Sequence, residues 1–454
     1  MAQQLVPLLA LLLGSAFLLM AGGINALVLP LRGSGEGFST FALGLLGTGW
    51  AVGYVLGCLY TPRLVRRVGH IRAFSVLAAT AGLAVLSSLI LMTPYAWVPL
   101  RAVSGFSFAG AAMIVESWMS ERTSPQNRGQ TFAVYTMVNL SATMLGQMSL
   151  AFGDPMTATF FALAAMLYLL ALIPTALTTS ATPGPLVQVR LDLAGLYRNS
   201  PIAVVAVFFV GVSNSSFGTL AAIYAQGIGL DIALIALFTS LPILAGAIAQ
   251  VPVGMLSDRL DRRTVIVGIA AAAIVADLMF LLVPPGSIGM TLAVATLFGA
   301  TIFSMYPVLI AHANDHASPD KYILTSGGLL LVFGLGSIVG PFAAGLLMEL
   351  TSVRALFFIT ALAHALIMGY AIWRISQRAA VSSIDKVIFI PAPVPRNSTP
   401  QTAVLSPQAP SSDLRSDEPA ARDSTDRDDA VDRDAGDEAA AHGQARDRSG
   451  APGL

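Results

Sequence analysis

The sequence predicts an all-α membrane protein: twelve transmembrane helices in two parallel-repeat six-helix bundles, followed by a disordered C-terminal tail. The first observation is composition, because 55% of the 454 residues are hydrophobic and only 11% are charged, whereas soluble chains carry about 25% charged residues. The second is a series of apolar runs, each close to the roughly 20 residues that cross a bilayer core. The third is that basic residues gather in alternate connections between these runs.

The apolar runs are expected to be helices, because the bilayer core offers no water to satisfy backbone polar groups. The first six are expected at residues 5–31, 38–60, 73–93, 96–119, 131–152 and 156–178. The second six are expected at residues 200–225, 231–256, 265–283, 288–311, 321–348 and 353–374. The first run is too long for the core of a secretory signal and no Lys or Arg precedes it, so it is interpreted as a membrane span.

The distribution of Lys and Arg predicts that both termini are cytoplasmic. In that orientation fourteen basic residues fall in cytoplasmic segments, whereas the opposite loops hold only Arg32 and Arg354. Basic residues favour the cytoplasmic side of a membrane. We therefore expect a multi-pass protein of the bacterial cytoplasmic (inner) membrane.

Changes in composition divide the chain into four parts. An N-terminal bundle (1–178) and a C-terminal bundle (200–378) are separated by a cytoplasmic linker (179–199) with a short amphipathic piece near its end. Residues 379–454 lose hydropathy, and the last 44 of them hold twelve acidic residues and six arginines. Such mixed-charge, aromatic-poor sequence rarely folds, so a disordered acidic cytoplasmic tail is expected, with a regulatory or partner-binding role as the alternative.

An internal repeat relates the two bundles. A shift of 194 residues aligns Gly105 with Gly299, Glu121 with Asp315, and Gly146 with Gly340. Because each half has an even number of helices, both keep the same orientation, as in a parallel repeat. Such halves place a binding site between them near the membrane midplane.

Two short connections carry related motifs. The connection after the eighth expected span reads Gly254-Met-Leu-Ser-Asp258-Arg259-Leu-Asp-Arg262-Arg263. The connection after the second keeps Gly57 and the basic pair Arg66-Arg67 but has Thr61 in place of the acid. We expect each basic pair to reach an acid at the end of a neighbouring helix, Glu121 in the first half and Asp315 in the second, as a gate that breaks when the halves rock. The alternative is that these charges only enforce topology.

These motifs resemble the signature loop of the major facilitator superfamily. Two further stretches are similar to motifs of that superfamily: Arg101-Ala-Val-Ser-Gly105, and the hinge-like glycine–proline stretch that contains Gly336, Gly340, Pro341 and Gly345. Glu116-Ser117-Trp118 and His312-Ala-Asn-Asp315-His316 also look like the YcaD-like branch. The resemblance covers roughly residues 5–375, and it implies that helices 1, 4, 7 and 10 surround a central cavity.

Polar residues inside the spans are candidates for that cavity, because ionisable side chains in a membrane are costly and need a reason. Arg101 and Glu116 lie near opposite ends of one helix with small residues between them, which suits a solute path or a close helix contact. The expected cavity residues are Asn25, Arg101, Gly105, Tyr135, Asn139, Thr143, Gln147, Asn214, Ser215 and Tyr306. Four of them, from Tyr135 to Gln147, follow at four-residue spacing as one polar ridge.

The candidates for coupling are Arg101, Glu116 and Asp277. The alternatives are that Arg101 extends to the outer interface, that Glu116 pairs with Arg66 or Arg67, and that Asp277 is hydrogen-bonded to a neighbour. His364 is interpreted as a packing histidine, and His312 with His316 as complementing a helix end rather than binding metal.

Together these features favour a secondary transporter that moves a small organic solute by alternating access in exchange for protons, with efflux or antiport favoured. The proton gradient and the lipid bilayer are the other expected partners, and a monomer is expected. No enzymatic activity, cofactor, metal or nucleic-acid partner is expected, because no phosphate loop, nucleophile elbow or ligand cluster is present. Arg101 leaves room for an anionic group on the solute. The alternative is a membrane scaffold or sensor that signals through its C-terminal tail.

Overall fold

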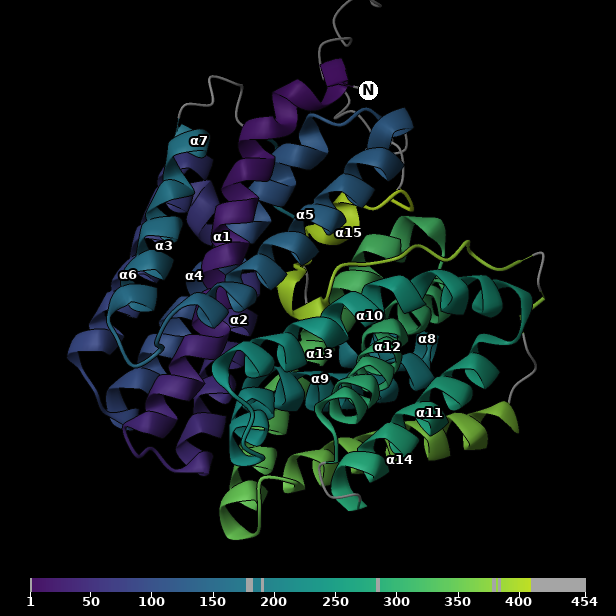
Figure 1. Ribbon diagram of the computed structural model, residues 1–454. Helices are drawn as coiled ribbons and strands as arrows, with labels where there is room; N and C mark the ends of the chain where they lie inside the picture. Colours follow the sequence, from purple (N-terminus) through teal and green to yellow (C-terminus); the bar gives the residue numbers. More distant parts are fainter. Residues whose placement is uncertain are drawn as a thin grey trace, which may run out of the picture. The chain divides into compact units, whose positions relative to one another are not determined.

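The computed structural model describes residues 2–176, 183–188, 192–282, 286–377, 381–382 and 385–409, with the side chains of residues 2–7 left aside. The regular elements in these ranges are helices, and no strand occurs in them. Most of the helices fall into two groups, drawn in purple to blue and in teal to green in Figure 1.

The first group contains the helices that precede residue 177. They are α1 (Ala2–Gly35), α2 (Thr40–Val68), α3 (His70–Ile90), α4 (Pro94–Glu121), α5 (Arg128–Met148), α6 (Thr159–Leu170) and α7 (Leu172–Ala176). Short 3-10 turns lie before and after α5, at η1 (Pro125–Asn127) and η2 (Ser149–Phe152). Within the group, α2 packs along α4, and α1 packs along α5.

The second group repeats this arrangement. It contains α9 (Pro201–Gly227), α10 (Ile232–Arg259), α11 (Arg262–Leu282), α12 (Ile288–Asn314), η3 (Pro319–Lys321), α13 (Tyr322–Leu350) and α14 (Ala355–Ile375). Here α10 packs along α12, and α13 packs along α9. The amphipathic piece expected in the linker is α8 (Leu193–Asn199), which begins at the capping side chain of Asp192 and packs against α9 and α13.

Ten of the twelve predicted spans coincide with helices that are long and apolar enough to cross a membrane. The predicted span 131–152 corresponds to α5, which carries polar side chains along its length and is not among these ten. The predicted span 156–178 corresponds to α6 and α7, a shorter apolar helix over Thr159–Thr175. The predicted order of twelve helical segments is therefore present. Two of them, 131–152 and 156–178, correspond to helices that are less apolar or shorter than the other ten.

Glycines show that the two groups are built alike. A side chain at Gly105 on α4 would collide with the backbone of Trp50 on α2, and one at Gly299 on α12 would collide with Pro242 on α10. The sequence repeat pairs these two glycines, and each lets two helices approach closely. The same holds for Gly146 against α1 and Gly340 against α9.

The C-terminal segment, defined here as residues 385–409, corrects one expectation. It contains two short helical pieces, η4 (Pro395–Asn397) and α15 (Thr402–Leu405), and was expected to be disordered. Instead it folds against both helix groups, and the side chains of Phe389, Thr399 and Leu405 are buried. The prediction failed because the segment is held by polar contacts and small buried surfaces, which hydropathy does not reveal. The acidic stretch beyond residue 409 lies outside the described residues.

Candidate functional site

A cavity of about 800 Å³, its open mouth included, lies between the two helix groups. Its walls come from both groups and from the C-terminal segment. The polar or charged residues that line it are Arg101, Thr143, Gln147, Tyr168, Asn214, Ser215, Arg396 and Asn397. Trp50 and several phenylalanines supply apolar surface. This mixture of apolar wall and few polar groups is typical of a small-molecule site.

Arg101 is the cationic group that the transmembrane helices contribute to this cavity. Its side chain is only 6% exposed, and its Nε has no hydrogen-bond partner in the part of the chain that the structure describes. No ion pair to Arg101 occurs among the described residues, and none of the residues lining the cavity is acidic. Asn214 also lines the cavity, and neither its amide oxygen nor its amide nitrogen is hydrogen-bonded to any described residue. Buried polar groups without partners are uncommon and point to a missing ligand or water.

The polar ridge predicted on α5 divides between different neighbours. Thr143 and Gln147 line the cavity as expected, and Gln147 also accepts a hydrogen bond of 2.9 Å from Ser240 on α10. Tyr135 instead donates to Glu116 at 2.7 Å. Asn139 accepts a hydrogen bond from Ser15 on α1 at 3.3 Å. The half of the ridge nearer the start of α5 therefore faces other residues of the bundle rather than the cavity.

Three other expected cavity residues take different positions. Asn25 is 1% exposed and does not line the cavity, although its Oδ1 lacks a partner. Tyr306 lines a neighbouring pocket under the C-terminal segment. Gly105 lies in the contact between α4 and α2, where Gly53 meets the backbone of Ala102 and Gly57 meets Phe106. The stripe of small residues on α4 is therefore a close helix contact rather than a solute path.

Glu116 is fully buried near the end of α4 and accepts three hydrogen bonds. Besides Tyr135, the donors are the hydroxyl groups of Thr402, at 2.6 Å, and Thr399, both from the C-terminal segment. The alternative that Glu116 pairs with Arg66 or Arg67 is wrong, because both arginines are exposed and neither forms an ion pair among the described residues.

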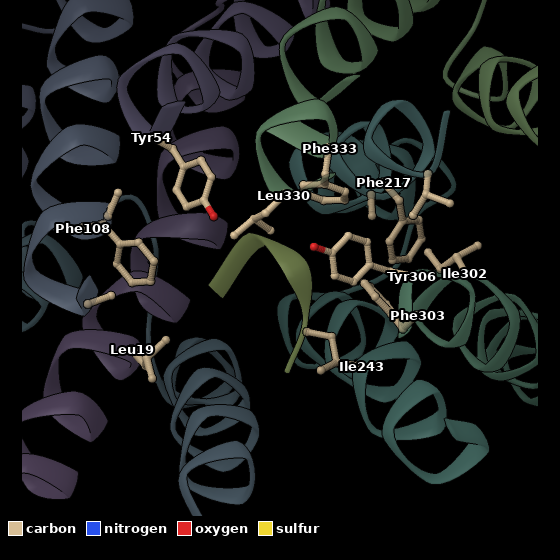
Figure 2. Packing of buried hydrophobic residues seen from close by; sticks show 14 of the residues in the cluster. Leu19, Tyr54, Phe108, Phe217, Ile243, Ile302, Phe303, Tyr306, Leu330 and Phe333 are labelled. Carbon is tan, nitrogen blue, oxygen red and sulfur yellow. The ribbon is translucent and has the colours of Figure 1, made fainter. Parts of the chain in front are cut away.

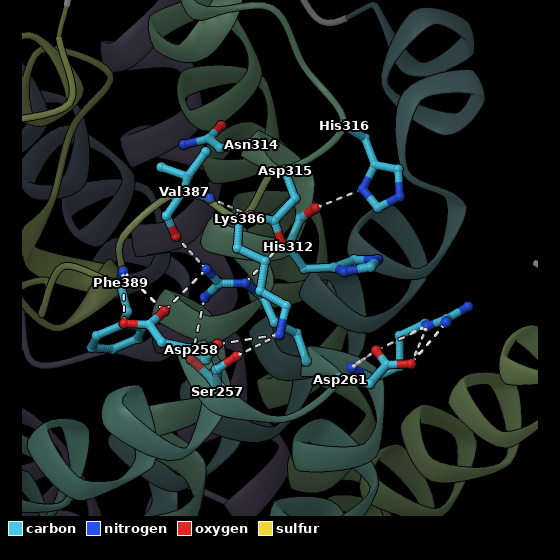
Figure 3. Close-up of polar contacts among 12 residues, drawn as sticks. Ser257, Asp258, Asp261, His312, Asn314, Asp315, His316, Lys386, Val387 and Phe389 are labelled. Carbon is cyan, nitrogen blue, oxygen red and sulfur yellow. Dashed lines mark hydrogen bonds and ion pairs between the residues drawn. The ribbon is translucent and has the colours of Figure 1, made fainter. Parts of the chain in front are cut away.

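The ion pair predicted for a gate in the second half is present (Figure 3). Arg262 donates from Nε to Asp315 at 2.7 Å and from its terminal nitrogen to Asp258 at 3.1 Å. Arg263 pairs with Asp261 at 2.7 Å, while Arg259 is exposed. Burial raises the pKa of Asp315, although Arg262 opposes that shift.

The equivalent gate in the first half is absent from the described structure. Glu121 is exposed and forms no ion pair there, and Thr61 stands buried where the second half has Asp258. Without that acid, the first half lacks the group that would draw Arg66 and Arg67 inward. The two halves are thus alike in helix packing and different in charge.

The glycine–proline motif on α13 faces two helices. Gly336 and Gly340 lie against α9, whereas Gly345 lies against Gly44 of α2, in the other helix group. Nearby, Thr40 donates to Glu349 at 2.7 Å and Thr48 donates to the Ile338 carbonyl at 2.9 Å. The end of the bundle remote from the gate is therefore closed by direct contact between α2 and α13.

Asp277 belongs to a buried polar chain in the second helix group. It accepts from Thr360 at 2.5 Å, and its other oxygen lies 2.7 Å from Nδ1 of His364. Nε2 of His364 lies 2.9 Å from the hydroxyl oxygen of Ser213 on α9. Ser213 precedes the cavity residues Asn214 and Ser215, so the chain connects Asp277 to a cavity helix. The alternative that Asp277 is hydrogen-bonded to a neighbour is therefore confirmed, and His364 is a buried, hydrogen-bonded histidine as expected, although the sequence did not indicate that Asp277 is its partner.

Several cavity residues were not predicted. Trp50 and Tyr168 look like ordinary apolar residues of a span, and Arg396 lies in the part of the chain predicted to be disordered. The guanidinium of Arg396 lies 4.4 Å from the ring centroid of Trp50 and donates to the Gly218 carbonyl at 3.1 Å.

Among the described residues no group of three His, Cys, Asp or Glu is placed to hold a metal.

Comparison with known proteins agrees with this fold. The family model of the Major Facilitator Superfamily matches residues 203–420. An uncharacterized MFS-type transporter of Yersinia pestis is 26% identical over 359 residues, covering 78% of this chain and 92% of the relative. The uncharacterized MFS-type transporter YcaD of Escherichia fergusonii is 25% identical over 362 residues, with the same coverage. The predicted resemblance to the major facilitator superfamily and its YcaD-like branch is confirmed.

Solved structures show the same fold. The nucleoside transporter NupG superposes with a TM-score of 0.69 at 13% identity, over 81% of this chain and 98% of that chain. A bacterial homolog of the human lysosomal transporter Spinster, in an inward-facing and occupied conformation, gives 0.68 at 14% identity, over 84% and 97%. The matches to the family model and to MFS-type transporters, together with the shared fold, support a membrane transporter.

Proposed function

We propose that the protein is a secondary transporter of the inner membrane, with both termini cytoplasmic, that moves a small organic solute bearing an anionic group. The observation that carries this proposal is the guanidinium of Arg101, which has no ion pair among the described residues and lies in a cavity whose described lining contains no acidic residue. A buried cation needs a counter-charge, and a carboxylate or phosphate is the group that a guanidinium binds best. The aromatic and aliphatic walls suit an apolar body on the same solute.

Coupling to protons is proposed to run through Asp277 and His364. A carboxylate and an imidazole 2.7 Å apart share a proton, and both are buried away from lipid and water. Their hydrogen-bond chain reaches Ser213, so a change of charge on the pair acts on the helix that holds Asn214. Efflux of the solute, or its exchange by antiport, remains the favoured mode of transport. Glu116 is not proposed as a coupling group in this state, because its carboxylate is hydrogen-bonded to the C-terminal segment.

The alternative of a membrane scaffold or sensor retains one supporting observation, namely that the C-terminal segment lies inside the bundle. It offers no reason for an unpaired arginine in a cavity. Transport is therefore favoured over a scaffold or sensor function.

A binding screen tests the proposed solute class. Full-length protein in detergent is heated with organic carboxylates, phosphate esters, and neutral and cationic solutes, and the shift in unfolding temperature is measured. A ligand at about 100 times its Kd stabilises the folded state by about 2.7 kcal/mol, which such a shift reveals. Anionic solutes are expected to stabilise the wild type, to act less on Arg101→Lys, and to have no effect on Arg101→Ala.

The screen includes a second form of the protein, because the C-terminal segment fills part of the cavity. In Thr399→Val/Thr402→Val both hydrogen bonds from the segment to Glu116 are removed. Stabilisation of this form and of Arg101→Ala by the same neutral or cationic solutes would contradict the anionic solute class.

A further inference from the structure

The C-terminal segment crosses from one helix group to the other. On the first group, Thr399 and Thr402 donate to the buried carboxylate of Glu116. Tyr54 of α2 donates to the Ser398 carbonyl, and Asn397 donates to Thr143 at 3.1 Å. Figure 2 shows the segment passing between Tyr54 on one side and Tyr306 on the other.

On the second group, the segment binds the gate itself. The backbone N–H of Val387 donates to Asp315 at 2.9 Å, and that of Phe389 donates to Asp258 at 3.2 Å. The Phe389 ring packs directly on Gly254, the glycine that begins the gate motif. Farther along, the N–H of Ala392 donates to Gln250 at 2.9 Å. The acids that hold Arg262 therefore also hold the C-terminal segment.

The same segment occupies the solute path. Val394, Arg396 and Asn397 line the cavity that contains Arg101. A second pocket nearer the gate is lined by Ser398, Thr399 and Thr402, opposite Tyr306 of α12. Because α2 and α13 close the other end of the bundle, the segment fills the end at which a solute would enter or leave in this state.

We propose that residues 385–409 form an autoinhibitory strap, which holds the two helix groups together at the gate end and competes with solute for access to the cavity. Alternating access requires the two groups to rock against each other. Hydrogen bonds to carboxylates on both groups, Glu116 on one and Asp258 and Asp315 on the other, oppose that movement because bonds to ionised groups are the strong ones. The blocking of solute transport by the strap rests on the proposed transport function, whereas the position of the strap between the helix groups is independent of it.

A labelling experiment on the full-length chain tests the strap without any solute. The single cysteine, Cys58, is replaced by Ser, and Ser215 on the cavity wall is replaced by Cys as a reporter. The rate of reaction with a water-soluble maleimide then measures access to the cavity. Two strap variants are compared: Thr399→Val/Thr402→Val, which removes both bonds to Glu116, and Ala392→Pro, which removes the donor to Gln250. The matched control is Ile388→Ala, since that side chain is 77% exposed and lies in the same segment.

The reporter is expected to react slowly in the otherwise unchanged chain and at least about tenfold faster in the Thr399→Val/Thr402→Val variant, because each bond removed there reaches a charged group. Ala392→Pro is expected to accelerate it in the same direction, and the Ile388→Ala control to match the unchanged chain. Reaction as fast with the strap intact as in both variants would overturn the proposal. Since this readout needs no transport, protection of the reporter in a protein that moves no solute would support the strap while contradicting the proposed transport function.

Discussion

The Asp277–His364 pair gives the sharpest stability prediction. In His364→Ala the Asp277 carboxylate loses its partner while remaining fully buried, with only Thr360 still donating to it. Removing one member of a buried ion pair costs about 3–5 kcal/mol, because the remaining charge is desolvated without compensation. In Asp277→Asn the amide oxygen still accepts from Thr360 and its nitrogen donates to the imidazole, whose other nitrogen then donates to Ser213. That variant is expected to lose about 1 kcal/mol or less.

The double variant separates charge from packing. With Asn at 277 no buried charge is left by the loss of the imidazole, so His364→Ala/Asp277→Asn is expected to be more stable than His364→Ala alone. The free energy of unfolding is measured for all four proteins by titrating denaturing detergent into mixed micelles, as in a double-mutant cycle. A His364→Ala variant within about 1 kcal/mol of the wild type, or a double variant less stable than His364→Ala, would contradict a cost from an uncompensated charge on Asp277.

The remaining predictions concern packing and the gate. Gly340→Ala should destabilise by about 1–3 kcal/mol, because its methyl group would meet the Val212 backbone, whereas the control Gly369→Ala has open space and should be neutral or slightly stabilising. Equal unfolding temperatures for these two variants would contradict the assigned α9–α13 contact. Arg262→Gln should release the gate, since Asp315 loses its ion pair, and a Cys reporter at Ser215 should then react faster than in Arg259→Gln, where the replaced arginine is exposed. Equal reporter rates in those two variants would count against the gate.

Much of the fold could be predicted because membrane spans need long apolar runs. The repeat pairs Gly105 with Gly299, and a side chain at either position meets the backbone of a neighbouring helix in the structure. The ion pair between Arg262 and Asp315 could also be predicted, because the loop motif identified the arginine and the internal repeat identified the acid.

The site was harder to predict because polar residues in a span have several ways to be satisfied. Spacing put Tyr135 and Gln147 on one ridge, yet Tyr135 binds Glu116 while Gln147 faces the cavity. Local sequence does not say which helix will lie opposite each turn. The C-terminal segment escaped prediction for a related reason: its partners, such as Glu116 and Asp315, come together only when the bundle has folded.

Proton-coupled transport of organic anions is tested most directly by solute-driven proton movement in proteoliposomes, followed with an internal pH indicator for the anions found by the binding screen. We expect a proton signal in the wild type that increases in Thr399→Val/Thr402→Val and is lost in Arg101→Ala. Solute movement without a proton signal would remove the role proposed for Asp277 and His364. Absence of movement for every anion, in folded protein with the strap released, would contradict the assignment as a transporter.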